Sequence, residues 1–103
     1  MRTEKENKQI ANTILVQLGG VEFVLCTGAK RFLLIDSGVR FHIGENQKRV
    51  STVTVRLNGN DMYDLQFEDS EKVLSKYTDI FCENLKDLFE ESTGLYVSLR
   101  PRQ

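Results

Sequence analysis

Apolar and polar side chains alternate in the middle of the chain, and this pattern restricts the possible folds. Over residues 39–43, 53–57 and 63–67, every second side chain is apolar and a polar side chain stands between each pair. Successive side chains of a β-strand point to opposite faces of a sheet, so this period of two predicts three strands with one apolar face each. The Asn58–Asp61 segment, NGND, is a strong hairpin signal between the last two. We therefore predict an antiparallel meander.

Two further strands are expected before this meander. Residues 21–27 are rich in apolar and β-branched side chains on both parities, which predicts a central strand covered on both faces. Residues 31–35 form the next expected strand, and the segment 36–38 after it reads as a tight turn in which Gly38 supplies a positive φ.

Helical periodicity is expected at both ends of the chain. Thr3 and Glu6 have the spacing of a capping box, and the apolar stripe that follows predicts a helix over residues 4–18. From residue 73 to residue 89, apolar side chains recur at steps of three and four, which predicts a long helix lying across the sheet. Asp69 or Ser70 can cap this helix, and Thr93-Gly94 supplies its stop. Residues 95–99 alternate again and are expected to add a short edge strand.

The predicted order of elements is α-β-β-β-β-β-α-β. A run of strands flanked by helices is typical of an α+β fold: here, an antiparallel sheet of about five to six strands packed against a long C-terminal helix and a shorter N-terminal helix. With 103 residues, 40% of them apolar, the chain is expected to form one domain over residues 1–103.

Neither a targeting segment nor a membrane span is expected. The N-terminal residues are charged and lack the apolar core of a secretory signal, and no stretch approaches the roughly 20 apolar residues that cross a bilayer. Cys26 and Cys82 lie far apart and have no CxxC partner, so we expect small buried side chains in a reducing compartment. These features predict a cytoplasmic protein.

The charges are distributed unevenly along the chain, although the net charge is only −1. Residues 1–60 carry nine basic and five acidic side chains, whereas residues 61–103 carry five basic and ten acidic ones. Such asymmetry can mean two separate binding faces of opposite charge. The interpretation we favour for the asymmetry itself is that an exposed acidic helix face complements a basic sheet face within one fold.

No residue pattern indicates catalysis. His42 is the only histidine, and nothing in the sequence links it to either cysteine, so we interpret it as a solvated strand residue. One histidine and two isolated cysteines are too few for a structural zinc site, and the acidic residues lack the order of a calcium loop. Residues 27–30 contain glycine and lysine without the spacing of a phosphate-binding loop. We therefore predict a non-enzymatic protein without a cofactor or metal.

A basic surface is predicted on the polar side of the sheet and at its corners. Its candidate nucleic-acid-binding residues are Lys30, Arg31, Arg40, Lys48, Arg49 and Arg56. Small sheets bind single strands through such grooves when aromatic side chains add a stacking platform. Here the strand aromatics share the parity of the core, and Asp64 and Glu68 on the polar parity repel phosphate. Nucleic-acid binding is therefore the second hypothesis.

Several short motifs resemble a group of small uncharacterised proteins carried by bacteriophages and integrative elements. The motifs are Leu18-Gly19-Gly20, Phe23, Thr27-Gly28-Ala29-Lys30, Val55-Arg56-Leu57-Asn58, Asp61-Met62-Tyr63-Asp64, Phe67 and Thr93-Gly94-Leu95-Tyr96. The likeness runs from about residue 12 to residue 99. It implies a mobile-element protein that acts inside a bacterial cell, and it carries over no catalytic residue. Residues 33–35 are more apolar than the resemblance leads one to expect.

A small non-catalytic phage protein is expected to act by binding a host protein. We predict an inhibitor of a bacterial nucleic-acid-guided defence system, of the anti-CRISPR type, whose acidic face competes for a basic groove. On the predicted long helix, that face comprises Asp79, Glu83, Asp87, Glu90 and Glu91. The alternative is a single-stranded nucleic-acid-binding accessory protein that uses the basic sheet face. A homodimer through the edge strand at residues 95–99 is also open.

Overall fold

The computed structural model describes residues 2–97, which form a five-stranded antiparallel sheet and three α-helices. The helices are α1 (Glu4–Leu18), α2 (Gly20–Thr27) and α3 (Leu85–Thr93), with a short 3-10 helix, η1 (Cys82–Asn84), before α3. The strands are β1 (Lys30–Ile35), β2 (Gly38–His42), β3 (Thr52–Leu57), β4 (Tyr63–Glu68) and β5 (Val73–Ile80). They lie in the order β1-β2-β3-β4-β5, and neighbours are antiparallel. The predicted α+β class and the central meander are confirmed.

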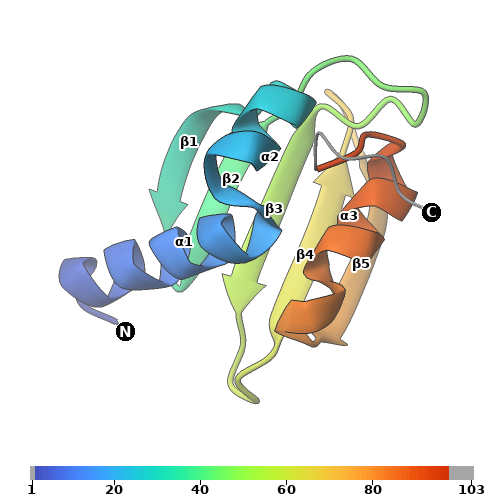
Figure 1. The fold of residues 1–103 in the computed structure, drawn as a ribbon. Helices are drawn as coiled ribbons and strands as arrows, with labels where there is room; N and C mark the ends of the chain where they lie inside the picture. Colours follow the sequence, from blue (N-terminus) through green and yellow to red (C-terminus); the bar gives the residue numbers. More distant parts are fainter. Residues whose placement is uncertain (1, 98–103) are drawn as a thin grey trace.

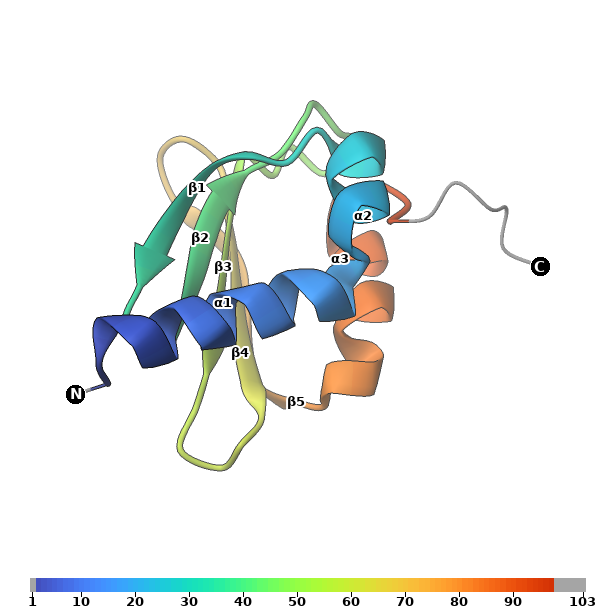
Figure 2. The same ribbon diagram turned by 60° about the vertical axis from the view of Figure 1, so that its left-hand side comes forward.

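All three helices lie on one face of the sheet, and the opposite face carries no helix (Figures 1 and 2). The core forms between the two layers. On the sheet side it contains the apolar parity of the predicted strands, and on the helix side it contains buried residues of α1, α2 and α3. The period of two along the strands thus decides which face the helices cover.

Aromatic rings connect the helices to the sheet through the centre of the core. The Phe23 ring of α2 lies edge-on to Phe41 of β2 and to Phe89 of α3, with centroid separations of 5.6 and 5.1 Å. The Phe89 ring also lies 6.3 Å from the Phe67 ring of β4. All four side chains are fully buried. A single cluster of rings therefore joins segments that are far apart in the sequence.

α1 has the boundaries that the sequence predicts. The Glu6 backbone N–H donates to the Thr3 hydroxyl at 3.2 Å, and the Thr3 backbone N–H donates to the Glu6 carboxylate at 3.1 Å, which completes the capping box. The helix ends at Gly19, whose φ of +129° is open to glycine. The chain bends by 69° before α2 begins.

The prediction of a strand over residues 21–27 is wrong, because this segment forms α2. Phe23 and Thr27 are buried at a spacing of four residues, while Val21 and Leu25 are exposed at the same spacing on the other side. β-branched composition is only a weak preference, and packing overrides it. A helix after the Gly19 bend brings Phe23 into the ring cluster.

The prediction of a long helix from residue 73 to residue 89 is also wrong, because its first half forms β5. Gln66 pairs with Lys76 and Phe67 with Ser75 in the register of β4 and β5. Two register shifts interrupt this ladder. Such bulges break the period of two, so the apolar spacing of an irregular strand resembles that of a helix. Only residues 85–93 keep the predicted α-helical conformation.

Two smaller expectations also need correction. Residues 95–97 are not in a strand, and residues 98 and 99 of the expected edge strand lie outside the described part of the chain. In the β1–β2 turn the positive φ belongs to Ser37, at +62°, and not to Gly38. Gly38 instead packs so closely against the backbone of Val55 and Arg56 that a Cβ atom has no room there. Glycine is required for close approach rather than for a positive φ.

Candidate functional site

The five acidic residues predicted to share one helix face lie on three different elements. Asp79 is in β5, Glu83 is in η1, and Asp87, Glu90 and Glu91 are in α3. This division follows directly from the replacement of half of the predicted helix by β5.

Asp79 takes part in the structure of a turn. Its carboxylate accepts hydrogen bonds from the side-chain amides of Asn58 at 2.7 Å and Asn60 at 3.3 Å. Its backbone N–H donates to the carboxylate of Asp64 at 3.1 Å, and its φ is +55°. Asp79 therefore ties the end of β5 to the β3–β4 turn.

Glu90 is also engaged within the fold. Its carboxylate accepts a hydrogen bond from the Val97 backbone N–H at 3.0 Å, and the side chain is only partly exposed. This bond holds the segment after α3 against the helix, where Val97 is buried. The role of Glu90 is thus at least partly structural.

The remaining three acidic residues, Glu83, Asp87 and Glu91, form what we call the acidic stripe. They are exposed and follow one another at steps of four residues along η1 and α3. Side chains at this spacing lie on the same side of a helix, and the opposite side of this helix is buried through Leu85 and Phe89. The stripe therefore faces outward, away from the core.

The face of the sheet without helices carries part of the predicted basic surface. One row across it consists of Arg40, Thr54, Gln66 and Lys76, which are successive partners in the strand register. A shallow hollow on this face has a volume of about 230 Å³. It is lined by Arg40, Thr54, Arg56, Asp64, Leu65, Gln66 and Lys76. Lys76 was missed by the sequence analysis, which placed it on a helix.

Acidic side chains offset much of the positive charge on this face. Arg40 forms an ion pair with Glu68, with 3.1 Å between Nη1 and Oε2. Arg56 stands opposite Asp64 in the register of β3 and β4. None of the residues that line the hollow is aromatic. The carboxylates of Asp64 and Glu68 thus lie beside the basic side chains of this face, as the polar parity of β4 predicts.

The other four predicted basic residues lie elsewhere. Lys30 and Arg31 are exposed on β1, the edge strand. Arg49 lines a hollow formed by residues 43–51, and Lys48 lines another beside Glu91 and Leu74. The structure therefore does not gather the six basic residues around one hollow, and it places Lys48 near an acidic residue.

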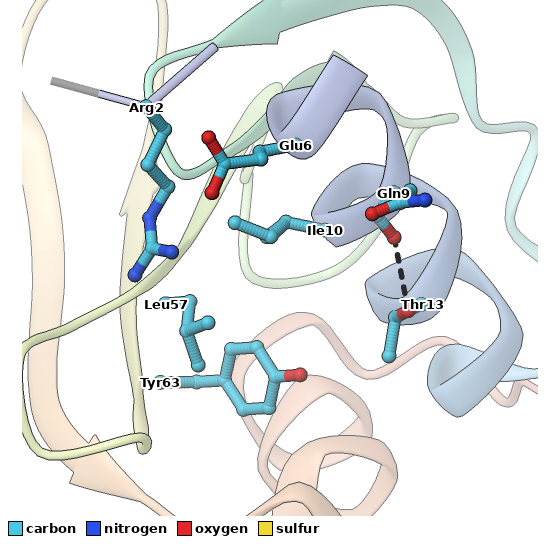
Figure 3. Close-up of a pocket in the computed structure, with 7 residues that line it drawn as sticks. All are labelled: Arg2, Glu6, Gln9, Ile10, Thr13, Leu57 and Tyr63. Carbon is cyan, nitrogen blue, oxygen red and sulfur yellow. Dashed lines mark hydrogen bonds between the residues drawn. The ribbon is translucent and has the colours of Figure 1, made fainter. Parts of the chain in front are cut away.

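A further hollow of about 220 Å³ lies between α1 and the ends of β3 and β4 (Figure 3). Its floor is apolar and consists of Ile10, Leu57 and Tyr63, while Arg2, Glu6, Gln9 and Thr13 form its polar side. The polar groups bond within the fold. Arg2 Nε donates to Ser37 Oγ at 2.9 Å, and the Thr13 hydroxyl donates to the Gln9 carbonyl. Glu6 belongs to the capping box.

Two titratable groups at this hollow have shifted pKa values. Burial raises the pKa of the Tyr63 phenol above its usual value of 10.0, and nearby Cys82 acts in the same direction. The Thr3 backbone N–H and hydroxyl lower the pKa of Glu6. Both shifts move the groups away from neutral pH, whereas a general acid or base works best with a pKa near it.

The cysteines and acidic residues form no metal centre in the described part of the chain. No group of three or more His, Cys, Asp and Glu side chains within residues 2–97 has the geometry to hold a metal ion. Cys26 is partly exposed and Cys82 is exposed, and both are free thiols. The expectation of two buried cysteines is therefore wrong.

None of the helices within residues 2–97 is long and apolar enough to cross a bilayer by itself. α1 and α2 taken together reach that length and composition, but they are bent by 69°.

Comparison of the chain with protein-family models, with curated proteins and with solved structures found no match.

Proposed function

We propose that this chain is a non-enzymatic protein that binds a basic surface of another protein through the acidic stripe. The observation that carries the proposal is the exposure of Glu83, Asp87 and Glu91 along one side of η1 and α3. The opposite side of the same helical segment is anchored in the core by Leu85 and Phe89, so the carboxylates stand on a rigid support.

Charge and rigidity together suit a partner with a basic groove. Asp87 and Glu91 lie slightly more than one helical turn apart, roughly 6 Å along the axis, so a partner meets a row of carboxylates at regular intervals. Complementary charge raises association rates and excludes partners of like charge.

The class of partner follows from the resemblance to proteins of phages and integrative elements. Such a protein acts in the bacterial cytoplasm, where nucleic-acid-guided defence complexes hold their nucleic acids in basic grooves. Occupation of such a groove by the acidic stripe inhibits the complex by competition, as anti-CRISPR proteins do. We therefore propose inhibition of a host defence complex as the biological role.

The alternative is an accessory protein that binds single-stranded nucleic acid. One observation favours it: Arg40, Arg56 and Lys76 line a single hollow on the face of the sheet without helices. Glu68 and Asp64 lie on the same face and oppose it. We rank this second because phosphate binding requires a net excess of positive charge.

The test compares two matched double variants in affinity purification from a bacterial host lysate. Glu83→Lys/Glu91→Lys changes the stripe, and Glu45→Lys/Glu71→Lys makes the same charge change at two exposed acidic residues elsewhere. We expect a nucleic-acid-binding host protein to be enriched by the wild type and the control, and to fall at least about tenfold with the stripe variant. Quantitative mass spectrometry measures the enrichment.

Purified partner protein then decides the mechanism. Added wild-type chain is expected to displace a labelled guide or target strand from the partner, and the stripe variant is expected to fail. Equal enrichment by both variants contradicts the proposal. Direct binding of the labelled strand by the chain itself, weakened by salt and by Arg56→Ala/Lys76→Ala, instead supports the alternative.

A further inference from the structure

The outer edge of β1 is apolar and unpaired. β1 pairs with β2 on one side, and within residues 2–97 no strand lies on its other side, where it forms the left-hand edge of the sheet in Figure 1. Phe32, Leu33 and Leu34 are 42%, 57% and 39% exposed. Exposed apolar edge strands are rare in stable monomers, because their free backbone groups pair readily with another strand.

These three exposed side chains are divided between the two faces of the sheet. Leu34 pairs with buried Val39, and the Phe32 ring lies 5.4 Å from that of buried Phe41, so both belong to the core face. Leu33 pairs with Arg40 and belongs to the face without helices. The core thus continues to the edge of the molecule and stays partly uncovered there.

The geometry of the β1–β2 hairpin determines which backbone groups are free. Ile35 and Gly38 flank a two-residue turn, so they form a hydrogen-bonded pair. Pairs alternate along an antiparallel ladder, so Leu34 directs its N–H and C=O outward, away from β2. A register shift before Leu33, with a φ of +56° at Arg31, ends the regular part of the strand. The regular edge is therefore short.

The charges at the two ends of this edge are complementary to each other. Lys30 and Arg31 stand exposed at the start of β1, and exposed Asp36 follows its end. When two copies of the strand run antiparallel, the basic end of each lies beside the acidic end of the other. Opposite charges on neighbouring strands stabilise the pairing.

We propose that a second copy of this chain covers the edge, with the two β1 strands paired antiparallel around a two-fold axis at Leu33. In this register Leu33 faces its own copy, and Phe32 of each chain faces Leu34 of the other. Directly opposed residues of an antiparallel pair point to the same face, so the exposed core-face side chains of both copies merge into one apolar strip. The sheets join into one continuous sheet of ten strands, and the contact is closed by symmetry.

The register has a direct chemical test. Leu33 and its copy form a non-hydrogen-bonded pair, in which Cα atoms are about 4.5 Å apart. Disulfides span Cα separations of about 4.4–6.8 Å. In a Cys26→Ser/Cys82→Ser background, Leu33→Cys is expected to give a covalent dimer of twice 11.8 kDa under mild oxidation. Val16→Cys, at a 72% exposed position of α1, serves as the matched control and is expected to stay monomeric on a non-reducing gel.

Analytical ultracentrifugation tests the non-covalent contact. The wild type is expected to sediment as a dimer. Leu33→Lys is expected to raise the dissociation constant at least about tenfold, while Val16→Lys leaves it unchanged. Leu33 is exposed, so circular dichroism is expected to show the same folded monomer in both variants. A wild type that sediments as a monomer at every concentration overturns the proposal. Equal cross-linking at Val16 and Leu33, or a Leu33→Lys dimer as tight as the wild type, overturns it too.

Discussion

Tyr63 belongs both to the core and to the hollow of Figure 3. Its ring contributes to the core from β4, with only 6% of its surface exposed, and its hydroxyl is enclosed by the helix layer. Burial disfavours the charged phenolate and raises the pKa of Tyr63; Cys82 reinforces this shift, while the Gln17 side chain opposes it. The fold therefore prefers the neutral phenol.

This preference predicts a loss of stability in alkali. Because the folded-state pKa of Tyr63 lies above the unfolded value of 10.0, its contribution to stability is complete below that pH and is lost as the pH rises through the folded-state pKa. The free energy of unfolding of Tyr63→Phe is therefore expected to fall less between about pH 8 and pH 12 than that of the wild type. Tyr96→Phe, at a 65% exposed position, is the control and is expected to follow the wild type. Parallel curves for all three proteins in urea titrations contradict the prediction.

The elements differ in how much of their conformation is decided locally. In α1 the cap, the apolar stripe and the glycine stop are all in the sequence, and each is present in the structure. In α2 and β5 packing overrides the local preference. Phe23 of α2 packs in the ring cluster, and β5 pairs with the edge of β4. A substitution at a local signal of α1, such as its cap, is therefore expected to change the free energy of unfolding directly.

Thr3→Ala tests this local contribution at α1. The substitution removes the hydroxyl that accepts the Glu6 N–H, and it is expected to lower the free energy of unfolding by about 1 kcal/mol. Thr13→Ala is the matched control, since its hydroxyl bonds only to the Gln9 carbonyl within the helix. Thr13→Ala is expected to change the free energy of unfolding much less, because the gain in helix propensity from threonine to alanine offsets the lost hydrogen bond. Equal losses for the two variants in urea unfolding argue against the cap.

Across the whole fold, aromatic rings in contact connect the two edge strands of the sheet, β1 and β5, through the helix layer. Consecutive ring centroids along this chain of contacts lie 5.1–6.3 Å apart. Its members, in order, are Phe32, Phe41, Phe23, Phe89, Phe67 and Tyr77. The chain begins at the edge proposed to bind a second copy and ends on β5. Phe89 is the link through α3, which carries the acidic stripe.

Phe89→Ala is expected to destabilise the whole fold. The ring is fully buried, and its removal leaves a cavity between α2, α3 and β4, at a cost of about 3–5 kcal/mol. Phe81→Ala removes the same side chain at a 53% exposed position and is expected to cost about 0.5 kcal/mol or less. Thermal and urea unfolding of the two variants measure the difference. A Phe89→Ala variant close to the wild type in stability contradicts the assignment of this ring to the centre of the core.

The candidate functional surfaces were only partly predictable. The parity of β2 and β3 places Arg40 and Arg56 on one face, as expected, because alternation is a property of the strands themselves. The acidic set divides between three elements, because residues 73–80 form a strand whose bulged spacing resembles a helix. Lys76 joins the basic face for the same reason. The division of the acidic residues and the place of Lys76 on the basic face become apparent only when the pairing of β4 with β5 is known.

The central meander, the apolar faces of β2, β3 and β4, and the boundaries of α1 follow from the sequence, because each depends on periodicity and on contacts a few residues apart. The helix at residues 21–27 and the strand at residues 73–80 follow only from tertiary contacts. Each segment has apolar positions that suit either a helix or a strand, so the contacts of Phe23 with Phe41 and Phe89, and the free edge of β4, determine their conformation. The exposure of the apolar edge of β1 also depends on tertiary structure, since it is the order of the strands that leaves β1 without a second neighbour within residues 2–97.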